Sequence, residues 1–275
     1  MLSRTERKAG GAFTLIELMV VIAVIGVLLG VMLPSLAGAR RQARLTRELA
    51  AVRSLLAAYT SYALENKSSL LPGHVAQAPS LRDDAGKVLS PAEVGKRWPW
   101  RLAPYIGSSL HGSLLVDERS RALADRTMAM WSYYVSLTPS FGLNYFHLGG
   151  DTAQPNQTLA GDVLTRLDQA VTPSRFVTFA SARFPSETGF SEGYFKIVPP
   201  TRAFEYSATG WSSEGYSDRL EPAAFGYIHP RWEGKAAVGH LDGNATTLSL
   251  EMLRDMRRWS QAAALAGESD WRQKP

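Results

Sequence analysis

A serine motif and five histidines are the groups in this chain whose chemistry suits catalysis or metal binding. Residues 189–193 read Gly-Phe-Ser-Glu-Gly and match the Gly-x-Ser-x-Gly pattern, which needs a strand before the serine and a helix after it. The sequence instead predicts a strand after Ser191, and Pro185 lies just before the motif. We therefore expect a glycine-rich turn here and no nucleophile.

The other catalytic and metal-binding patterns are sparse. The chain has no cysteine, which excludes disulfides, thiol catalysis and cysteine-ligated zinc. The histidines lack His-Glu-x-x-His spacing, and no phosphate-cradling loop is present. One metal set remains by residue type: His229, His240 and Asp242, which could meet across a predicted hairpin. We expect ordinary structural roles for them, no metal site and no enzymatic activity.

The most informative ionisable group is Glu17, because it lies inside an apolar segment. Residues 13–33 read FTLIELMVVIAVIGVLLGVML, which is about 21 residues and long enough to span a bilayer. A carboxylate in such a helix costs about 2.5–3.5 kcal/mol at the bilayer midplane, less near an end, and usually has a functional partner. If the basic leader before Phe13 is removed, the α-amine of a neighbouring subunit becomes a natural partner for Glu17.

Three interpretations of this segment compete. A secretory signal peptide has a basic start and a small-residue cleavage site, which Ala37-Gly38-Ala39 resembles. Its apolar region is usually about 7–15 residues long and free of carboxylates, so this segment fits poorly. A plain membrane anchor explains the length of the segment but gives Glu17 no role.

The third interpretation rests on a resemblance. Residues 11–17, Gly-Ala-Phe-Thr-Leu-Ile-Glu, resemble the type III signal of type IV pilins and type II secretion pseudopilins. The resemblance implies that a prepilin peptidase cuts before Phe13 and N-methylates it, and that Glu17 aids filament assembly. Pro34 also matches, because helices of this family often carry a proline at this distance.

The residue before the cleavage site departs from the family pattern. The family usually has Gly immediately before the Phe, whereas this chain has Ala12, preceded by Gly11. Ala is small enough for cleavage before Phe13, which we predict. Cleavage between Gly11 and Ala12 is the alternative, and it moves Glu17 to the sixth place of the mature chain.

One long helix is predicted over residues 13–66, with 13–33 in the membrane. Pro34 is expected to kink or loosen it, and Gly26 and Gly30 form a Gly-x-x-x-Gly spacing that permits close helix packing in lipid. After Pro34, apolar residues recur at spacings of four and three, which predicts an amphipathic face on a folded domain. Its members are Leu45, Leu49, Val52, Leu56, Tyr59 and Ala63. We place Arg40, Arg44, Arg47 and Glu48 on the opposite side.

The arginines after the span raise a question of topology. Arg40, Arg41, Arg44 and Arg47 outnumber the basic residues of the leader, so the positive-inside rule favours a cytoplasmic C-terminal side. The pilin resemblance requires the opposite: leader in the cytoplasm, remainder in the periplasm. We follow the motif, and expect the arginines to face acidic neighbours or lipid head groups. We do not expect nucleic-acid binding.

Residues 67–275 are predicted to form one α+β head. Strands are expected at 128–135, 175–181 and 194–198, where β-branched and aromatic residues are enriched. Asp242-Gly243 between two apolar runs predicts a β-hairpin of residues 235–241 and 244–248, followed by a helix over 250–264.

The hairpin carries a second resemblance, to large pilin-like proteins with a C-terminal motif of His, nine residues and Asp-Gly. Asp242-Gly243 falls into that frame, but Trp232 occupies the place of the histidine and Asn244 that of a common final histidine. Some pseudopilins also bind calcium through carboxylates in a late loop. The matching residue types here are Asp218, Glu221 and Asp242, without an Asp-x-Asp-x-Asp loop.

The sequence therefore predicts a pilin-like α+β protein: a leader at 1–12, a long helix at 13–66 and a head at 67–275. With 45% hydrophobic residues and a net charge of +5, the chain is not disordered. The expected function is structural, as a filament subunit that leaves the bacterial inner membrane. Its expected partners are the prepilin peptidase, other pilin-like subunits, inner-membrane lipid and a secretion or pilus assembly platform. The alternative is a membrane-anchored periplasmic binding domain or enzyme that uses this signal for export.

Overall fold

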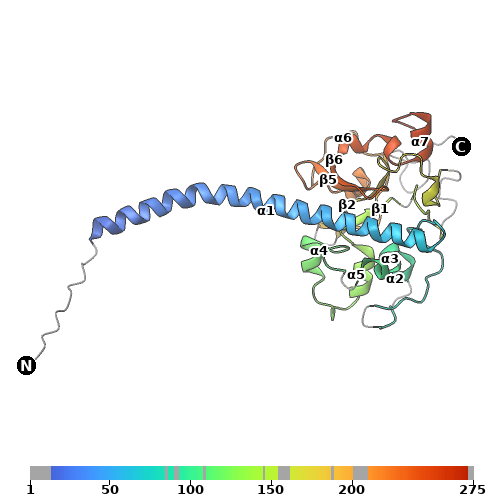
Figure 1. The fold of residues 1–275 in the computed structure, drawn as a ribbon, viewed down its shortest axis with the longest axis horizontal. Coiled ribbons are helices and arrows are strands. Elements are labelled where there is room, and N and C mark those ends of the chain that lie inside the picture. The colour runs from blue at the N-terminus through green and yellow to red at the C-terminus, as the bar shows by residue number, and fades with distance from the viewer. Residues whose placement is uncertain are drawn as a thin grey trace, which may run out of the picture. The chain divides into compact units, whose positions relative to one another are not determined.

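The computed structural model describes residues 14–83, 86–89, 93–107, 110–144, 146–153, 162–186, 189–200 and 210–271. The chain divides into two compact units, with the boundary between Arg44 and Leu45. We call the described residues 14–44 the free helix segment and those from Leu45 onward the head. The long helix α1, Leu15–Glu65, belongs to both units, and Figure 1 draws it as one ribbon.

Helix α1 is continuous over 51 residues and passes through Pro34 without interruption. Proline has no N–H to donate to the carbonyl of Gly30, so one rung of the i to i−4 ladder is missing there. The residues on both sides of Pro34 keep helical geometry, so this gap does not end the helix.

The second half of α1 is the central helix of the head. The predicted apolar face is confirmed, because Val52, Leu56, Tyr59 and Ala63 are all buried. The predicted placement of Glu48 on the opposite, solvated side is wrong, since its side chain is buried as well. The head covers a wider arc of α1 than the spacing of the large apolar residues indicates, and the covered arc includes Ala51, Leu55 and Ala58.

The main sheet of the head has four antiparallel strands in the order β1-β2-β5-β6. Their bounds are β1 Phe141–Leu143, β2 Val177–Ser181, β5 Lys235–His240 and β6 Ala245–Ser249. Strand β2 confirms the strand predicted at 175–181, and β5 and β6 confirm the hairpin. Gly243 in its turn has a φ of 91°, a conformation that glycine adopts without strain. A long N-terminal helix on an antiparallel sheet is the α+β, pilin-like architecture that the sequence predicts.

Helix α1 packs directly against the sheet at a glycine, Gly239. Gly239 on β5 pairs with Phe179 on β2, so the two residues are neighbours on the sheet. Phe179 packs edge-on against Tyr59 of α1 at 5.8 Å between ring centroids. A Cβ atom on Gly239 would lie 2.4 Å from Cγ1 of Val52, closer than real contacts allow. Gly239 therefore sets the distance between helix and sheet.

Smaller elements complete the head. A second antiparallel hairpin consists of β3, Arg183–Ser186, and β4, Gly189–Glu192. The short helices are α2 Glu93–Lys96, α3 Trp98–Ile106, α4 Asp117–Ala122, α5 Trp131–Leu137, and the 3-10 turns η2 Leu167–Gln169 and η3 Pro222–Phe225. Tyr62 of α1 contacts Tyr105 of α3, so α3 packs beside the central helix.

Two predicted strands are wrong. The segment 128–135 contains the start of α5 instead, with Trp131 and Val135 buried one helical turn apart. Short aromatic runs fit either a strand or a buried helix, and spacing alone does not decide between them. The segment 194–198 forms no strand; only Lys196 makes an isolated bridge, to Leu143.

The helix predicted over 250–264 is broken into three pieces. These are α6 Leu250–Leu253, η4 Met256–Arg258 and α7 Gln261–Ala266. The breaks occur at capping residues: the Asp255 side chain accepts from the backbone N–H of Arg257, and Ser260 accepts from that of Ala263. Asp and Ser side chains satisfy the free N–H groups at helix starts, so each of them begins a new helical piece.

The helix–sheet approach gives a testable prediction. Gly239→Ala forces a Cβ against Val52 and Leu56, which are both buried and have little room to shift. We expect a loss of about 1–3 kcal/mol in the free energy of unfolding, measured by denaturant titration of the full-length protein in detergent. Gly215→Ala is the matched control, because a Cβ there meets nothing within 4 Å. Equal stability of the two variants would contradict the close packing.

Candidate functional site

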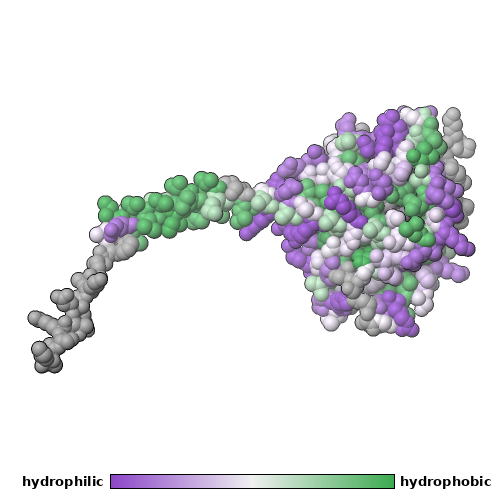
Figure 2. Space-filling view, in the orientation of Figure 1, coloured by the Kyte–Doolittle hydropathy of each residue, from purple (hydrophilic) through white to green (hydrophobic). Residues whose placement is uncertain are grey.

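The free helix segment is exposed, and from Leu15 to Leu36 its large side chains are apolar on every side of the helix. Its large hydrophobic side chains from Leu15 to Leu36 are each at least 44% exposed, and Leu15 reaches 76%. Figure 2 shows the hydrophobic colour along this stretch of α1. The segment is long and apolar enough to cross a membrane. None of its most apolar window is buried among the described residues, so lipid or other apolar helices must shield it from water.

The first turn of this segment is closed by a reciprocal cap. Thr14 precedes the helix, and its backbone N–H and its hydroxyl both donate to Oε2 of Glu17 at 2.9 Å. The backbone N–H of Glu17 donates in return to the Thr14 hydroxyl at 3.2 Å. This is a capping box, which satisfies N–H groups that would otherwise be free at the helix start. Glu17 therefore has a role within its own chain in addition to the predicted one between chains.

The residues predicted for processing and those predicted for helix packing lie in different parts of the chain. Gly11, Ala12 and Phe13 lie outside the described residues, and so does the side chain of Pro34. Gly26 and Gly30 lie on α1 with nothing within 4 Å of where a Cβ would be. They present a bare strip of backbone one helical turn apart, which permits close approach of another helix.

A buried carboxylate is the main feature of the head that the sequence does not reveal. Glu48 of α1 is 1% exposed and accepts two hydrogen bonds from Nε of Arg231, at 3.0 and 3.1 Å. The indole N–H of Trp232 donates to Oε2 of Glu48 at 2.6 Å. Arg231 and Trp232 come from the loop before β5, so this cluster joins α1 to the sheet. Trp232, which the second resemblance aligns with the histidine of that motif, therefore has a structural role in this chain.

Arg231 is shared between two carboxylates. Its Nη1 lies 3.5 Å from Oε2 of Glu192 and 3.4 Å from Nδ1 of His229. Burial by itself lowers the pKa of Arg231, but Glu48 and Glu192 raise it above its ordinary value. Burial raises the pKa of Glu192, and the attraction of Arg231 offsets this only in part. Burial and the positive charge of Arg231 lower the pKa of His229 to about 3, so this imidazole is neutral at physiological pH.

The three residues of the predicted metal set are not brought together. His240 pairs with Val177 at one end of β2, whereas the backbone N–H of His229 donates to Ser181 at the other end. At about 3.3 Å per residue, some 13 Å of strand separates the two positions. Asp242 caps the hairpin turn by accepting from the N–H of Asn244. The register of β2 therefore overturns this set as a single site.

The calcium candidates are engaged elsewhere or apart. Asp218 lies 3.7 Å from Arg183 and accepts a hydrogen bond from the Tyr216 hydroxyl. Glu221 precedes η3, away from the hairpin turn that holds Asp242. Among the residues that the structure describes, no three His, Asp or Glu side chains are grouped to hold a metal ion.

Ser191 lies in a strand, contrary to the turn predicted for residues 189–193. It sits within β4 and pairs with Phe184 of β3. A nucleophile elbow needs the serine between a strand and a helix, and this geometry is different. A second serine, Ser260, forms a buried set with Asp162 and His147, but its hydroxyl donates to Asp162 at 2.7 Å. That set is enclosed in the core, where it anchors the start of α7.

Asp162 holds this buried set together. Burial by itself raises the pKa of Asp162, but hydrogen bonds from His147, Ser260 and the amide of Ala262 lower it below its ordinary value. His147 and Ser260 are fully buried, so no substrate reaches them from solvent. The set stabilises the fold and offers no accessible nucleophile.

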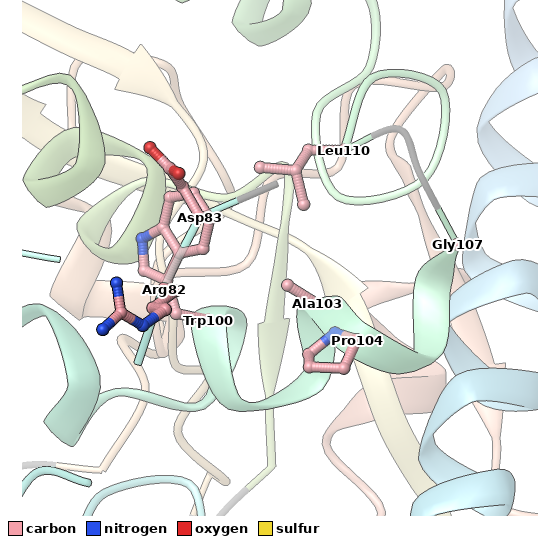
Figure 3. Close-up of a pocket in the computed structure, with 7 residues that line it drawn as sticks. All are labelled: Arg82, Asp83, Trp100, Ala103, Pro104, Gly107 and Leu110. Carbon is pink, nitrogen blue, oxygen red and sulfur yellow. The ribbon is translucent and has the colours of Figure 1, made fainter. Parts of the chain in front are cut away.

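A cavity of about 210 Å³ lies beside α3 (Figure 3). Binding pockets for drug-sized molecules are usually about 300–1,000 Å³, so this one is small, whereas two further cavities of about 340 and 620 Å³ fall within that range. Ala103 and Pro104 project from α3, with Leu110 across from them and Arg82, Asp83 and Trp100 to one side. These lining residues include one guanidinium and one carboxylate but no histidine or hydroxyl group. They therefore do not form a catalytic set.

Comparisons with known proteins identify one part of the chain. Residues 7–33 match the family model of the prokaryotic N-terminal methylation motif. No curated protein and no solved structure matches the chain. The match confirms that the chain carries a prepilin-type signal. It covers part of the leader and most of the membrane-capable stretch, and it does not extend to the head.

The shared arginine gives a prediction for stability. Glu48→Ala removes one partner of a buried ion pair and leaves Arg231 with only the more distant Glu192. We expect a loss of about 3–5 kcal/mol in the free energy of unfolding, because an uncompensated buried charge is costly. The double variant Glu48→Leu/Arg231→Met removes both charges and is expected to lose clearly less. If the double variant loses as much as the single one, charge pairing is not what this cluster contributes.

His229 gives a prediction for pH dependence. Its pKa in the folded chain is about 3, below the ordinary 6.5, so protons bind preferentially to the unfolded chain. The stability that depends on a neutral His229 is present above pH 6.5 and is lost as the pH falls toward 3. The slope has an upper limit of about 1.4 kcal/mol per pH unit. Denaturation at several pH values should show a shallower acid loss for His229→Asn; parallel curves would contradict the assignment.

Proposed function

We propose that this chain is a pilin-like structural subunit, held in the bacterial inner membrane by the free helix segment and then assembled into a filament through it. One observation carries the proposal: α1 exposes apolar side chains all round in its first half and is the buried central helix of the head in its second half. Helix α1 therefore attaches the head to the lipid or the neighbouring helices that cover its exposed half. The prepilin-type signal at residues 7–33 supports processing of this end of the chain.

Processing and assembly follow from the chemistry of that end. A prepilin peptidase cuts before Phe13 and methylates the new α-amine, with the leader in the cytoplasm and the head in the periplasm. In the bilayer, lipid covers the apolar side chains. In the filament, the apolar helices of neighbouring subunits cover them instead, and Gly26 and Gly30 permit close contact. A secretion or pilus platform carries out the transfer.

Glu17 serves in two ways in this proposal. In the single chain it completes the capping box with Thr14, which keeps the first turn helical. In the filament its carboxylate also pairs with the α-amine of a neighbouring subunit, so that the charge is not left unpaired among apolar helices. Both roles are compatible, because a carboxylate accepts several hydrogen bonds at once.

The head is proposed to act without catalysis. Its buried ionisable residues Glu48, Asp162 and Arg231 are hydrogen-bonded in structural clusters. The three cavities of about 210, 340 and 620 Å³ have no histidine among their described lining residues. These features support a display or spacing role for the head, with a filament as its scaffold.

Substitutions at Thr14 and Glu17 separate the two roles. Glu17→Gln keeps the capping box, since Gln also completes it, but removes the negative charge. Thr14→Ala removes the cap and keeps the charge. The proposal predicts that Glu17→Gln and Glu17→Leu insert into membranes but form few or no filaments. Thr14→Ala is expected to assemble, with helix stability reduced by about 1 kcal/mol.

The measurement is the amount of sheared or pelleted filament per unit of membrane-inserted protein, in cells with the assembly system. Membrane insertion is checked in the same cells by resistance to alkaline extraction. Normal filaments from Glu17→Gln, together with loss of filaments in Thr14→Ala, would assign Glu17 to capping alone. Normal filaments from Glu17→Leu would contradict the proposed assembly role altogether.

A further inference from the structure

The asparagines of this chain follow a pattern that the proposed function does not explain. The chain has four asparagines, and three of them begin an Asn-x-Ser or Asn-x-Thr triplet whose middle residue is not proline. These triplets are Asn66-Lys67-Ser68, Asn156-Gln157-Thr158 and Asn244-Ala245-Thr246. This is the acceptor pattern for N-linked glycosylation, and the acceptor has to lie at the surface because the attached sugar is bulky. The fold therefore decides which triplet can carry a sugar.

The triplet at Asn66 is engaged by the fold. Asn66 follows the last residue of α1 and is half-buried, and its side-chain amide donates to the backbone carbonyl of Tyr62 at 2.8 Å. Lys67 and Ser68 have φ values of 54° and 66°, so a tight turn holds the rest of the triplet. The nitrogen that would take the sugar already lies against the helix backbone. Asn156 lies outside the described residues.

The triplet at Asn244 is in the opposite situation. Asn244 lies in the turn between β5 and β6 and is exposed. Its backbone N–H donates to Oδ1 of Asp242 at 3.0 Å, and its carbonyl accepts from the N–H of His240 at 2.8 Å. Its side-chain amide makes no hydrogen bond to any described residue. The turn therefore fixes the backbone of Asn244 and leaves Nδ2 free.

The two residues that follow complete the pattern. The hydrogen bond between His240 and Asn244 continues the ladder of β5 and β6, so the alternation of strand side chains extends to Asn244. Ala245 is only 5% exposed and points into the core, whereas Asn244 and Thr246 point to the other side of the strand. The Thr246 hydroxyl also makes no hydrogen bond to a described residue. The amide and the hydroxyl that define the triplet thus lie on one side, and neither is engaged.

We propose that Asn244 is an acceptor for N-linked glycosylation, with the sugar donated as a glycosyl diphosphate by a separate transferase. Nδ2 of Asn244 attacks the anomeric carbon of the sugar, and a C–N bond forms as the bond from that carbon to the diphosphate oxygen breaks. The diphosphate leaves with the electron pair of that bond, and the amide proton passes to a base of the transferase. No oxidant or reductant is needed.

Two kinds of donor have this chemistry: a polyprenyl diphosphate that carries a complete oligosaccharide, and a nucleotide diphosphate that carries one sugar. The lipid-linked donor is favoured, because the membrane insertion proposed above places acceptor and donor at one bilayer. This choice of donor rests on the proposed function, whereas the choice of Asn244 rests on the hairpin. The sugar is compatible with the folded head, since the hydrogen bonds of the turn use no side-chain atom of Asn244.

The experiment uses the full-length protein purified in detergent from its native membrane. The protein is digested, and the peptide that contains Asn244 is fragmented in a mass spectrometer under conditions that keep a sugar on its residue. We expect a sugar mass on Asn244 that is lost in Asn244→Gln and in Thr246→Val. The Val variant keeps the branched shape that suits a strand but lacks the hydroxyl, whereas Thr246→Ser restores the hydroxyl and is expected to restore the sugar. Asn66→Gln is the matched control and should leave the sugar on Asn244 unchanged.

The outcomes test the acceptor and the donor separately. An Asn244 peptide detected only without sugar, sugar on another asparagine instead, or sugar that persists in Thr246→Val would overturn the acceptor assignment. A single oligosaccharide mass supports the lipid-linked donor, whereas a ladder of masses that begins with one sugar contradicts it.

The N-terminal peptide of the same sample separates this inference from the proposed function. A chain that begins at Phe13 with a bare Asn244 contradicts the glycosylation alone. A chain that keeps Met1 and carries sugar on Asn244 contradicts the proposed function alone.

Discussion

The apolar surface of the first half of α1 has to be kept from water, and this requirement shapes the rest of the molecule. From Leu15 to Leu36 its large side chains are exposed on every side, and the described residues provide no cover. Because the same helix continues into the head, the head cannot separate from whatever shields that surface. Lipid around these side chains can be replaced by other apolar helices without any change in the fold, since lipid tails and apolar side chains are similarly apolar.

Several contacts hold the second half of α1 in place within the head. Gly239 lets β5 approach Val52 and Leu56, and the aromatic contact of Tyr59 with Phe179 fixes the same face. The buried Glu48–Arg231 pair, with Trp232, adds polar contacts near the point where the head begins. Such pairs add little net stability over apolar packing but make misplacement costly, because a shifted helix leaves a buried charge alone. The cluster thus specifies the register between α1 and the sheet.

Local patterns in the sequence predict the features whose causes are local. The spacing of Val52, Leu56 and Tyr59 predicts a buried helix face, and Asp242-Gly243 predicts the hairpin; both are confirmed. The partners of Glu48 lie 183 and 184 residues away along the chain, so its burial has no local signal. His229 and His240 are close in sequence, but strand register places them at opposite ends of β2. The Thr14–Glu17 cap, in contrast, has a local pattern, because Thr-x-x-Glu before an apolar run is typical of a capping box. The length of the apolar run is the more obvious signal at the same place.

Intact mass and N-terminal sequencing of the protein purified from its native membrane test the central claim most directly. The claim is that the apolar end of α1 becomes a processed, membrane-retained assembly segment. It predicts a mature chain that begins with N-methylated Phe13 and keeps every residue of the exposed apolar stretch. A chain that begins at Arg40 would mean that the apolar stretch is a discarded signal peptide, and a chain that keeps Met1 would mean a plain anchor. Either result would contradict the account.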